Sequence, residues 1–359
     1  MRPSSGLRMI FFAICFYLFL SWLNPDLFLR SDGPSDCPPS FSASATRSLS
    51  GERRLIVEVS HGLGNRLRAY ASAAALAART GRALELVWAR DVHLKASFSE
   101  LFEGASDVLL HTESFLNCAT ASPHFEVYDY MKNPVDWKKR KAVNHRTKKH
   151  IYVRTAYELK GRQKVRDEEI AAALQKIRPS NDVRTLMYEI EEQFKEECNV
   201  ELSECVGVHI RMQNNLAKDI PGIFSLPKTD PRHAGKRMQA VAKSRLKCHH
   251  SHFSRVIKSR QRDKMDKPGQ VYFVVADCQE ARDALRENFG KYVFSPRLRQ
   301  HRACEGENSR SSDCVRLALA ELLLLVRMNT LIYSDESSFS EIILKFGLFG
   351  RQPSSGCSA

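Results

Sequence analysis

The chain has 359 residues, of which 43% are hydrophobic and 27% are charged, and its net charge is +14. This composition excludes wholesale disorder, and the length fits two domains with a sizeable core plus a short extra segment. The basic excess favours anionic partners, but much of it lies in two blocks, residues 138–149 and 228–267, with no nucleic-acid-binding motif around them. We therefore expect no nucleic-acid partner.

The N-terminal segment predicts attachment to a membrane. Arg2 and Arg8 precede an apolar stretch from Met9 to Leu23. Arginine on the N-terminal side favours an orientation with the N-terminus in the cytoplasm. The predicted parts are a cytoplasmic tail (1–8), a signal anchor (9–26) and a flexible stem rich in Ser, Pro and Gly (27–52). Because the apolar stretch is short for a membrane span, a cleaved signal peptide is the alternative.

Both interpretations place the body of the chain in the secretory lumen, and we expect a single-pass type II protein of the Golgi or ER membrane. An oxidising lumen permits disulfides, and the chain has ten cysteines. Two pairs are close enough in sequence to suggest local bridges, Cys198 with Cys205 and Cys304 with Cys314, although sequence alone does not define the pairing.

From residue 53 onward, predicted strands and helices alternate. Leu55–Val59 predicts a strand, Asn65–Thr80 a helix with Gly81 as its C-terminal cap, and Ala83–Trp88 a second strand. Residues 100–200 mix strands, loops and helices and end in an amphipathic helix, Asp182–Glu197. The strand–helix–strand unit at the start implies a parallel sheet.

The second half repeats this alternation. Its predicted strands and helices, in chain order, are Cys205–Ile210, Val271–Ala276, Glu280–Phe289, Asp313–Met328, Thr330–Ser334 and Ser338–Phe346. Two α/β halves in succession predict two Rossmann-like domains facing a cleft, an N-terminal domain (53–200) and a C-terminal domain (201–359).

The first candidate site is the motif between the first strand and the first helix, His61-Gly62-Leu63-Gly64-Asn65-Arg66-Leu67-Arg68. Glycines let the backbone approach a ligand, and a helix N-terminus favours negative charge. Leu67 stands where a dinucleotide fingerprint has its third glycine, so that motif is excluded. Gly62, Gly64, Asn65 and Arg66 are candidate ligand-binding residues, and the alternative is an ordinary tight turn with incidental polar side chains.

The second candidate site follows the strand Val206–Ile210. His209 and Arg211 are two residues apart, so they point to one face where the strand ends. Ligands of open α/β sheets bind at the carboxyl ends of strands, and the two-pronged guanidinium of arginine suits a diphosphate. The alternative is a strand-end salt bridge beside a hydrogen-bonded core histidine.

Two further candidates also follow predicted strands. Asp277 comes directly after Val271–Ala276, where a carboxylate could accept hydrogen bonds from a nucleotide. Ser337, Ser338 and Phe339 begin the last helix, where free N–H groups and hydroxyls favour an anion. For both, the alternative is ordinary helix capping. The sequence contains no Asp-x-Asp, which argues against a metal-bridged nucleotide-sugar site, and we expect no metal.

Together these motifs resemble the superfamily of α-1,2-, α-1,6- and protein O-fucosyltransferases, in particular its nodulation and α-1,6 branch. The shared features, in the same chain order, are a Gly-x-Gly-Asn-Arg turn (Gly62–Arg66), a His-x-Arg strand end (His209–Arg211) and a Ser-Ser-Phe-Ser loop (Ser337–Ser340). The resemblance implies a GT-B fold, GDP-fucose as donor, a glycan or glycoprotein acceptor, inversion at the anomeric carbon and no required metal or other cofactor.

The resemblance also implies roles for single residues. Arg211 would bind the β-phosphate and assist departure of GDP, His209, Asp277 and Ser337–Phe339 would contact GDP, and Asn65 and Arg66 would line the cleft. The chain departs from many members after Arg211, where Met212, Gln213 and Asn214 replace a second arginine and an aspartate. No general base is assigned, and Lys218 and Asp219 are nearby candidates. Another nucleotide sugar, or a catalytically silent GDP-sugar- or glycan-binding module, are the alternative functions.

Overall fold

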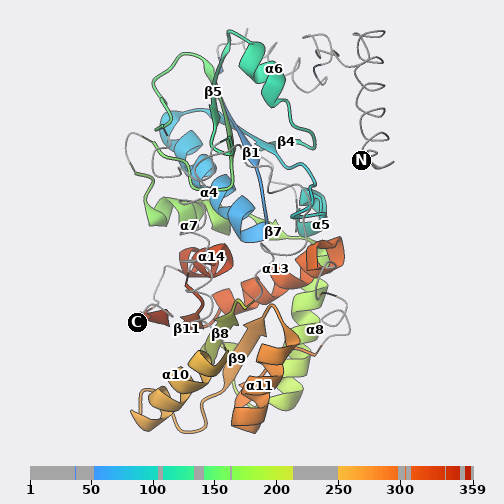
Figure 1. Ribbon diagram of the computed structural model, residues 1–359, viewed down its shortest axis with the longest axis vertical. Helices are drawn as coiled ribbons and strands as arrows, with labels where there is room; N and C mark the ends of the chain where they lie inside the picture. The colour runs from blue at the N-terminus through green and yellow to red at the C-terminus, as the bar shows by residue number, and fades with distance from the viewer. Residues whose placement is uncertain are drawn as a thin grey trace, which may run out of the picture.

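The computed structural model has two α/β domains stacked along its long axis (Figure 1). It describes residues 52–103, 108–132, 141–161, 164–212, 250–297, 309–335, 337–347 and 352–356, together with Cys37 and Cys304. The predicted tail, the signal anchor and, apart from Cys37 and Glu52, the stem lie outside these residues. In the part of the chain that the structure describes, none of the helices has the length and hydropathy of a membrane span.

The N-terminal sheet is parallel, and its described strands follow the order β4–β2–β1–β6–β5. They are β1 (Arg54–Val59), β2 (Ala83–Val87), β4 (Leu109–His111), β5 (Phe125–Asp129) and β6 (His150–Thr155). Every residue of β1 is buried, as expected for the central strand of a sheet covered on both faces. Helix α4 (Leu63–Thr80) follows β1 and ends at Gly81, which adopts the predicted left-handed cap conformation with φ 59°.

The remaining described elements of this half are short. They are α5 (Phe98–Leu101), β3 (Phe102–Glu103), α6 (Leu116–Ala121), α7 (Asp167–Gln175) and β7 (Arg178–Pro179). Strands β3 and β7 form a separate antiparallel pair. The strand–helix–strand unit predicted for residues 55–88 is therefore confirmed, with boundaries shifted by one or two residues.

The C-terminal sheet is also parallel, with its described strands in the order β10–β9–β8–β11–β12. They are β8 (Val206–Ile210), β9 (Tyr272–Ala276), β10 (Val293–Phe294), β11 (Thr330–Tyr333) and β12 (Gln352–Gly356). The accompanying helices are α10 (His250–Arg262), α11 (Gln279–Phe289), α13 (Ser312–Val326) and α14 (Ser338–Phe346). The chain adds β9 and β10 on one side of β8, then β11 and β12 on the other, so the strand order reverses between β8 and β11. In open α/β sheets, ligands bind at such a point.

Two helices tie the domains together. Helix α8 (Asn181–Glu197) precedes the C-terminal sheet in the chain but packs against α13, and its Phe194 contacts Phe273 and Phe294 with ring centroids 6.2 and 5.1 Å apart. By packing, α8 therefore belongs with the C-terminal domain, although residues 53–200 were predicted to form the N-terminal one. Helix α14, from the C-terminal half of the chain, packs against α4 and α7 of the N-terminal half (Figure 1). One buried apolar cluster extends across both domains as a result.

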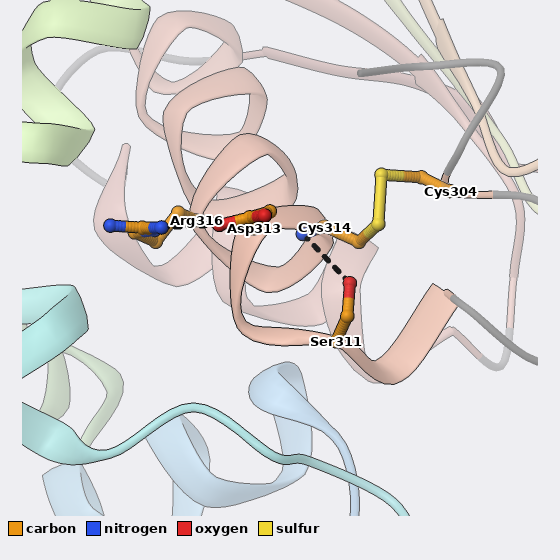
Figure 2. Close-up of a disulfide and its surroundings, with 5 residues drawn as sticks. All are labelled: Cys304, Ser311, Asp313, Cys314 and Arg316. Carbon is orange, nitrogen blue, oxygen red and sulfur yellow. Dashed lines mark hydrogen bonds and ion pairs between the residues drawn. A yellow bond between two sulfur atoms is a disulfide. The ribbon is translucent and has the colours of Figure 1, made fainter.

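The described residues form two disulfides. Cys304–Cys314 confirms the predicted pairing and joins the loop before α13 to the first turn of that helix (Figure 2), and Cys37 pairs with Cys118. The suggested Cys198–Cys205 bridge is not formed. Both of these thiols are free and buried in the core, and Cys205 Sγ lies 3.6 Å from the carbonyl oxygen of Glu201.

Replacing Cys304 and Cys314 together with serine is expected to lower the free energy of unfolding by about 2–3 kcal/mol, because the bridge restricts a short loop in the unfolded chain. Denaturant unfolding of the oxidised wild type and the double variant measures this difference. Under reducing conditions, which also open Cys37–Cys118, the wild type and the double variant should have equal stability. Equal stability of the oxidised wild type and the double variant contradicts the prediction.

Candidate functional site

The three C-terminal motifs meet at the carboxyl ends of β8, β9 and β11. Ser334 N–H donates to the carbonyl of His209 (3.0 Å), and its hydroxyl accepts a hydrogen bond from the N–H of Arg211 (2.9 Å). On the other side of β8, Asp277 N–H donates to the carbonyl of Ile210 (3.3 Å). Residues separated by more than a hundred positions in sequence are thus placed together at the point where the strand order reverses.

Arg211 and Asp277 form an ion pair at this point. The distance from Arg211 Nε to Asp277 Oδ2 is 3.3 Å, and the arginine side chain remains 30% exposed. Among the described residues, none pairs with the two terminal nitrogens of Arg211, so both can donate to an anion. Asp277 Oδ1 accepts the N–H of Met212 (2.8 Å), while the cap of α11 is Cys278. Asp277 therefore orients the segment after β8.

His209 is buried and neutral at the end of β8. Its Nδ1 lies 2.7 Å from Ser340 Oγ, and the hydroxyl of Ser340 donates to the carbonyl of Ser334 (2.9 Å). A hydroxyl has one hydrogen, so His209 must donate from Nδ1, which leaves Nε2 as an acceptor. The ring stacks on Phe339, with centroids 4.8 Å apart. Burial lowers the pKa of His209 from 6.5 to about 4.

This burial predicts a pH-dependent stability. Since the pKa of His209 is lowered in the folded state, the unfolded chain binds the extra proton first, and stability is lost as pH falls from about 6.5 to about 4. Replacing His209 with glutamine, which keeps a donor for Ser340, should reduce the loss between about pH 7 and about pH 4.5 by on the order of 2–3 kcal/mol. Denaturant unfolding at the two pH values measures it. An unchanged pH dependence in the variant contradicts a neutral His209.

Helix α14 presents its N-terminus to the same place. Ser337 is its N-cap residue but makes no side-chain capping hydrogen bond. The first N–H groups of a helix have no acceptor within the helix and carry partial positive charge. The N–H groups that begin with Ser338 and Phe339 therefore form an anion-binding end next to His209.

The glycine turn of the N-terminal domain contacts this helix end directly. A Cβ on Gly64 would lie 2.6 Å from the carbonyl carbon and oxygen of Ser338 and 2.8 Å from the nitrogen of Phe339. These atoms belong to the backbone, so only glycine fits without moving one domain against the other. Two motifs more than 270 residues apart in sequence are thus in contact, and Gly64 fixes how closely they approach.

The polar residues of the turn have different surroundings. Arg66 is fully buried, donates to the carbonyls of His61 (2.7 Å) and Ala89 (2.6 Å), and pairs with Asp91 (2.9 Å). Its guanidinium therefore holds the turn in place from within the protein. His61, whose carbonyl it binds, adopts a left-handed conformation with φ 69°, which is uncommon for a residue other than glycine.

Asn65 is half-buried, and Oδ1 of its side chain accepts a hydrogen bond from Arg68 (2.7 Å). Arg68 also pairs with Glu341 of α14 (2.8 Å), so it connects the two domains beside the site. Arg68 ends the sequence motif of this turn but was given no role there, and Asp91 was not singled out from sequence. In the part of the chain that the structure describes, no group of three or more His, Cys, Asp or Glu side chains could hold a metal ion.

This arrangement is GT-B-like: two parallel α/β domains meet with candidate ligand-binding residues at the carboxyl ends of their central strands. The chain is similar to the crystal structure of fucosyltransferase NodZ from Bradyrhizobium, with a TM-score of 0.50, 16% identity, and coverage of 84% of this chain and 94% of that one. No family model and no curated protein matches. The resemblance expected from the motifs is confirmed for the fold.

Two other solved structures are similar at lower scores. One is a variant of Arabidopsis thaliana FUT1 in complex with GDP, with a TM-score of 0.48, 15% identity, and coverage of 98% of this chain and 79% of that one. The other is POFUT1 in complex with GDP, with a TM-score of 0.47, 13% identity, and coverage of 86% of this chain and 99% of that one.

Proposed function

We propose that this chain is a glycosyltransferase that moves fucose from GDP-fucose to a hydroxyl group of a glycan or glycoprotein. The observation that carries the proposal is the position of the Arg211–Asp277 pair beside the N-terminus of α14, at the reversal of strand order in a fold shared with the fucosyltransferase NodZ. The motif resemblance to fucosyltransferases, which rests on sequence, supports the same donor.

The proposed reaction is a single displacement with inversion. The bond between the anomeric carbon and the β-phosphate oxygen breaks, its electron pair stays on GDP, and the acceptor oxygen bonds to the opposite face of the carbon. The acceptor hydroxyl loses its proton to a base that we do not assign. Because negative charge grows on the departing diphosphate, donors already aimed at it lower the barrier.

The described residues can supply those donors without a metal. The two terminal nitrogens of Arg211, which pair with none of the described residues, are proposed to bind the β-phosphate, and the first N–H groups of α14 add a second donor set. We propose that His209, Asp277 and Ser337–Phe339 contact GDP and that Asn65, with Gly62 and Gly64, lines the cleft from the N-terminal domain. Arg66 supports the turn from within.

We also propose that the catalytic domains are luminal and held at a Golgi or ER membrane by residues 9–26. The basic flank of the apolar stretch and the disulfides among the described residues support this location. Protease treatment of sealed microsomes containing the full chain tests it. Protection of the C-terminal domain is expected, and digestion before the membrane is opened contradicts it.

Competition binding tests the donor. The soluble part of the chain, starting near residue 47, is mixed with a fluorescent GDP analogue and chelator, and GDP-fucose, GDP-mannose and UDP-galactose are compared as competitors. GDP-fucose should compete most strongly. A stronger effect of another sugar nucleotide contradicts the proposed donor, and tight GDP binding without any consumption of donor favours the silent binding module.

A further inference from the structure

Arg310 extends from the C-terminal domain to the glycine turn of the N-terminal domain. It lies between β10 and α13, directly before Ser311, the N-cap of α13. A Cβ on Gly62 would lie 3.3 Å from Arg310 Nη1, so this glycine leaves room for the guanidinium. Arg310 was not singled out from sequence, because it belongs to no recognisable motif.

The charges around Arg310 are those of the candidate site. Its electrostatic neighbours are Arg211, Asp91 and Asp277, and its positive charge also acts on His93. Burial, followed by the like charge of Arg211, lowers the pKa of the Arg310 guanidinium. An arginine nevertheless stays charged in a protein, so two positive groups face the same region.

The Arg310 guanidinium is half-buried, yet none of the described residues forms a hydrogen bond or an ion pair with it. Partly desolvated arginines are costly unless their fork of donors is engaged. Arg211 likewise uses only Nε in its contact with Asp277. Two guanidinium groups from separate segments, each with donors that no described residue engages, suit an anion with several oxygens.

The backbone of Arg310 is held from the N-terminal domain. Its carbonyl accepts the N–H of Lys95 (3.1 Å). Two residues further on, the hydroxyl of Ser312 donates to Glu100 (2.6 Å). Because both contacts cross between the domains, the position of Arg310 depends on the two domains meeting as they do here.

The disulfide restrains the same loop from the other side. Cys304 and Cys314 enclose Arg310, and the Ser311 side chain accepts the N–H of Cys314 (3.4 Å) (Figure 2). Arg316 lies on the opposite side of the first turn of α13 from the disulfide and pairs with Asp313 (Figure 2). Within one segment, therefore, Arg310 is directed to the site and Arg316 is engaged elsewhere.

We propose that Arg310 is a second diphosphate-binding residue, which acts together with Arg211 on the phosphates of a nucleoside diphosphate. This inference rests on the proposed function. Its chemical basis is that a diphosphate carries more charge and more oxygens than one arginine fork can satisfy. The guanidinium of Arg310, which lies between the disulfide-bonded Cys304 and Cys314, would supply a second fork of donors.

Calorimetric titration with GDP and with guanosine, which lacks the phosphates, tests the assignment. Arg310→Ala should weaken GDP binding by about tenfold or more and leave guanosine binding unchanged, since a charge-assisted contact is lost only from the phosphates. Arg310→Lys should fall between, because it keeps the charge without the fork. Arg316→Ala, six positions along the same segment, is the matched control and should bind both ligands like the wild type.

The outcomes distinguish a failure of the proposed function from a failure of the role assigned to Arg310. A wild type that does not bind GDP contradicts the proposed function and this inference together. A wild type that binds GDP, with Arg310→Ala binding it equally well, contradicts the role of Arg310 alone. Equal weakening of GDP and guanosine binding by Arg310→Ala also overturns the role, because it reports a general disturbance of the site.

Discussion

Turnover by Arg211→Ala is expected to fall by about two to three orders of magnitude in kcat, equivalent to about 3–4 kcal/mol of transition-state stabilisation. The reason is that the two terminal nitrogens of Arg211, which pair with none of the described residues, can donate to the departing diphosphate as it gains charge, while Asp277 holds the side chain in place. The interaction strengthens as the bond to the sugar breaks. The effect should therefore appear mainly in kcat, with a smaller change in KM.

Steady-state kinetics with GDP-fucose measures this effect. Arg211→Lys keeps the charge but lacks the fork, so its kcat should lie between those of the wild type and the alanine variant. Arg297→Ala is the control, since Arg297 is an exposed residue of the same domain that pairs with Glu197. Near-normal turnover in Arg211→Ala would contradict the proposed role.

Gly64→Ala is expected to disturb the contact between the domains. The added methyl would lie 2.6 Å from backbone atoms of Ser338, which cannot move aside as a flexible side chain can. We expect a loss of about 1–3 kcal/mol in the free energy of unfolding, as for other overpacking substitutions, and a large loss of GDP affinity. The affinity falls because the N-terminus of α14 is displaced.

Gly62→Ala provides the comparison for this prediction. There the nearest atom is the end of the flexible Arg310 side chain at 3.3 Å, so the stability loss should be smaller. Thermal unfolding and GDP titration of both variants measure the difference. If the two alanine substitutions cost the same stability, the contact between Gly64 and Ser338 does not limit the approach of the domains.

The parts of the fold that were predictable have strong local signals. Residues 55–88 combine two apolar strands with an Ala-rich helix and a glycine cap. Each of these features depends on residues that are close together in the sequence. Strand β12, Gln352–Gly356, was not predicted, because a run of Gln, Pro, Ser and Gly has little preference for strands. The packing of α8 against the C-terminal domain depends on tertiary contacts that no local pattern carries.

The candidate site was predictable where its residues follow strands. His209, Arg211 and Asp277 are adjacent because parallel strands end at the same edge of a sheet. His209 is both the buried, hydrogen-bonded histidine and the neighbour of the candidate site, so the two interpretations of it are compatible.

The contacts of the arginines could not be predicted from the sequence. Arg66 and Arg68 both lie in the first turns of α4, but only the folded structure shows that Arg66 points into the core while Arg68 pairs across to Glu341. Arg310 lies far from the glycine turn in the sequence, and a loop held by a disulfide and by Lys95 brings it there. Such a placement depends on two domains folding together.

Release of GDP from GDP-fucose tests the central claim most directly. The part of the chain that starts near residue 47 is incubated with GDP-fucose, a broad mixture of glycan and glycoprotein acceptors and a chelator. The Arg211→Ala variant is measured under the same conditions. We expect GDP release by the wild type that depends on acceptor, persists with chelator and is nearly absent in the variant. A wild type that binds GDP but releases none from GDP-fucose with any acceptor, with or without added metal, would contradict it.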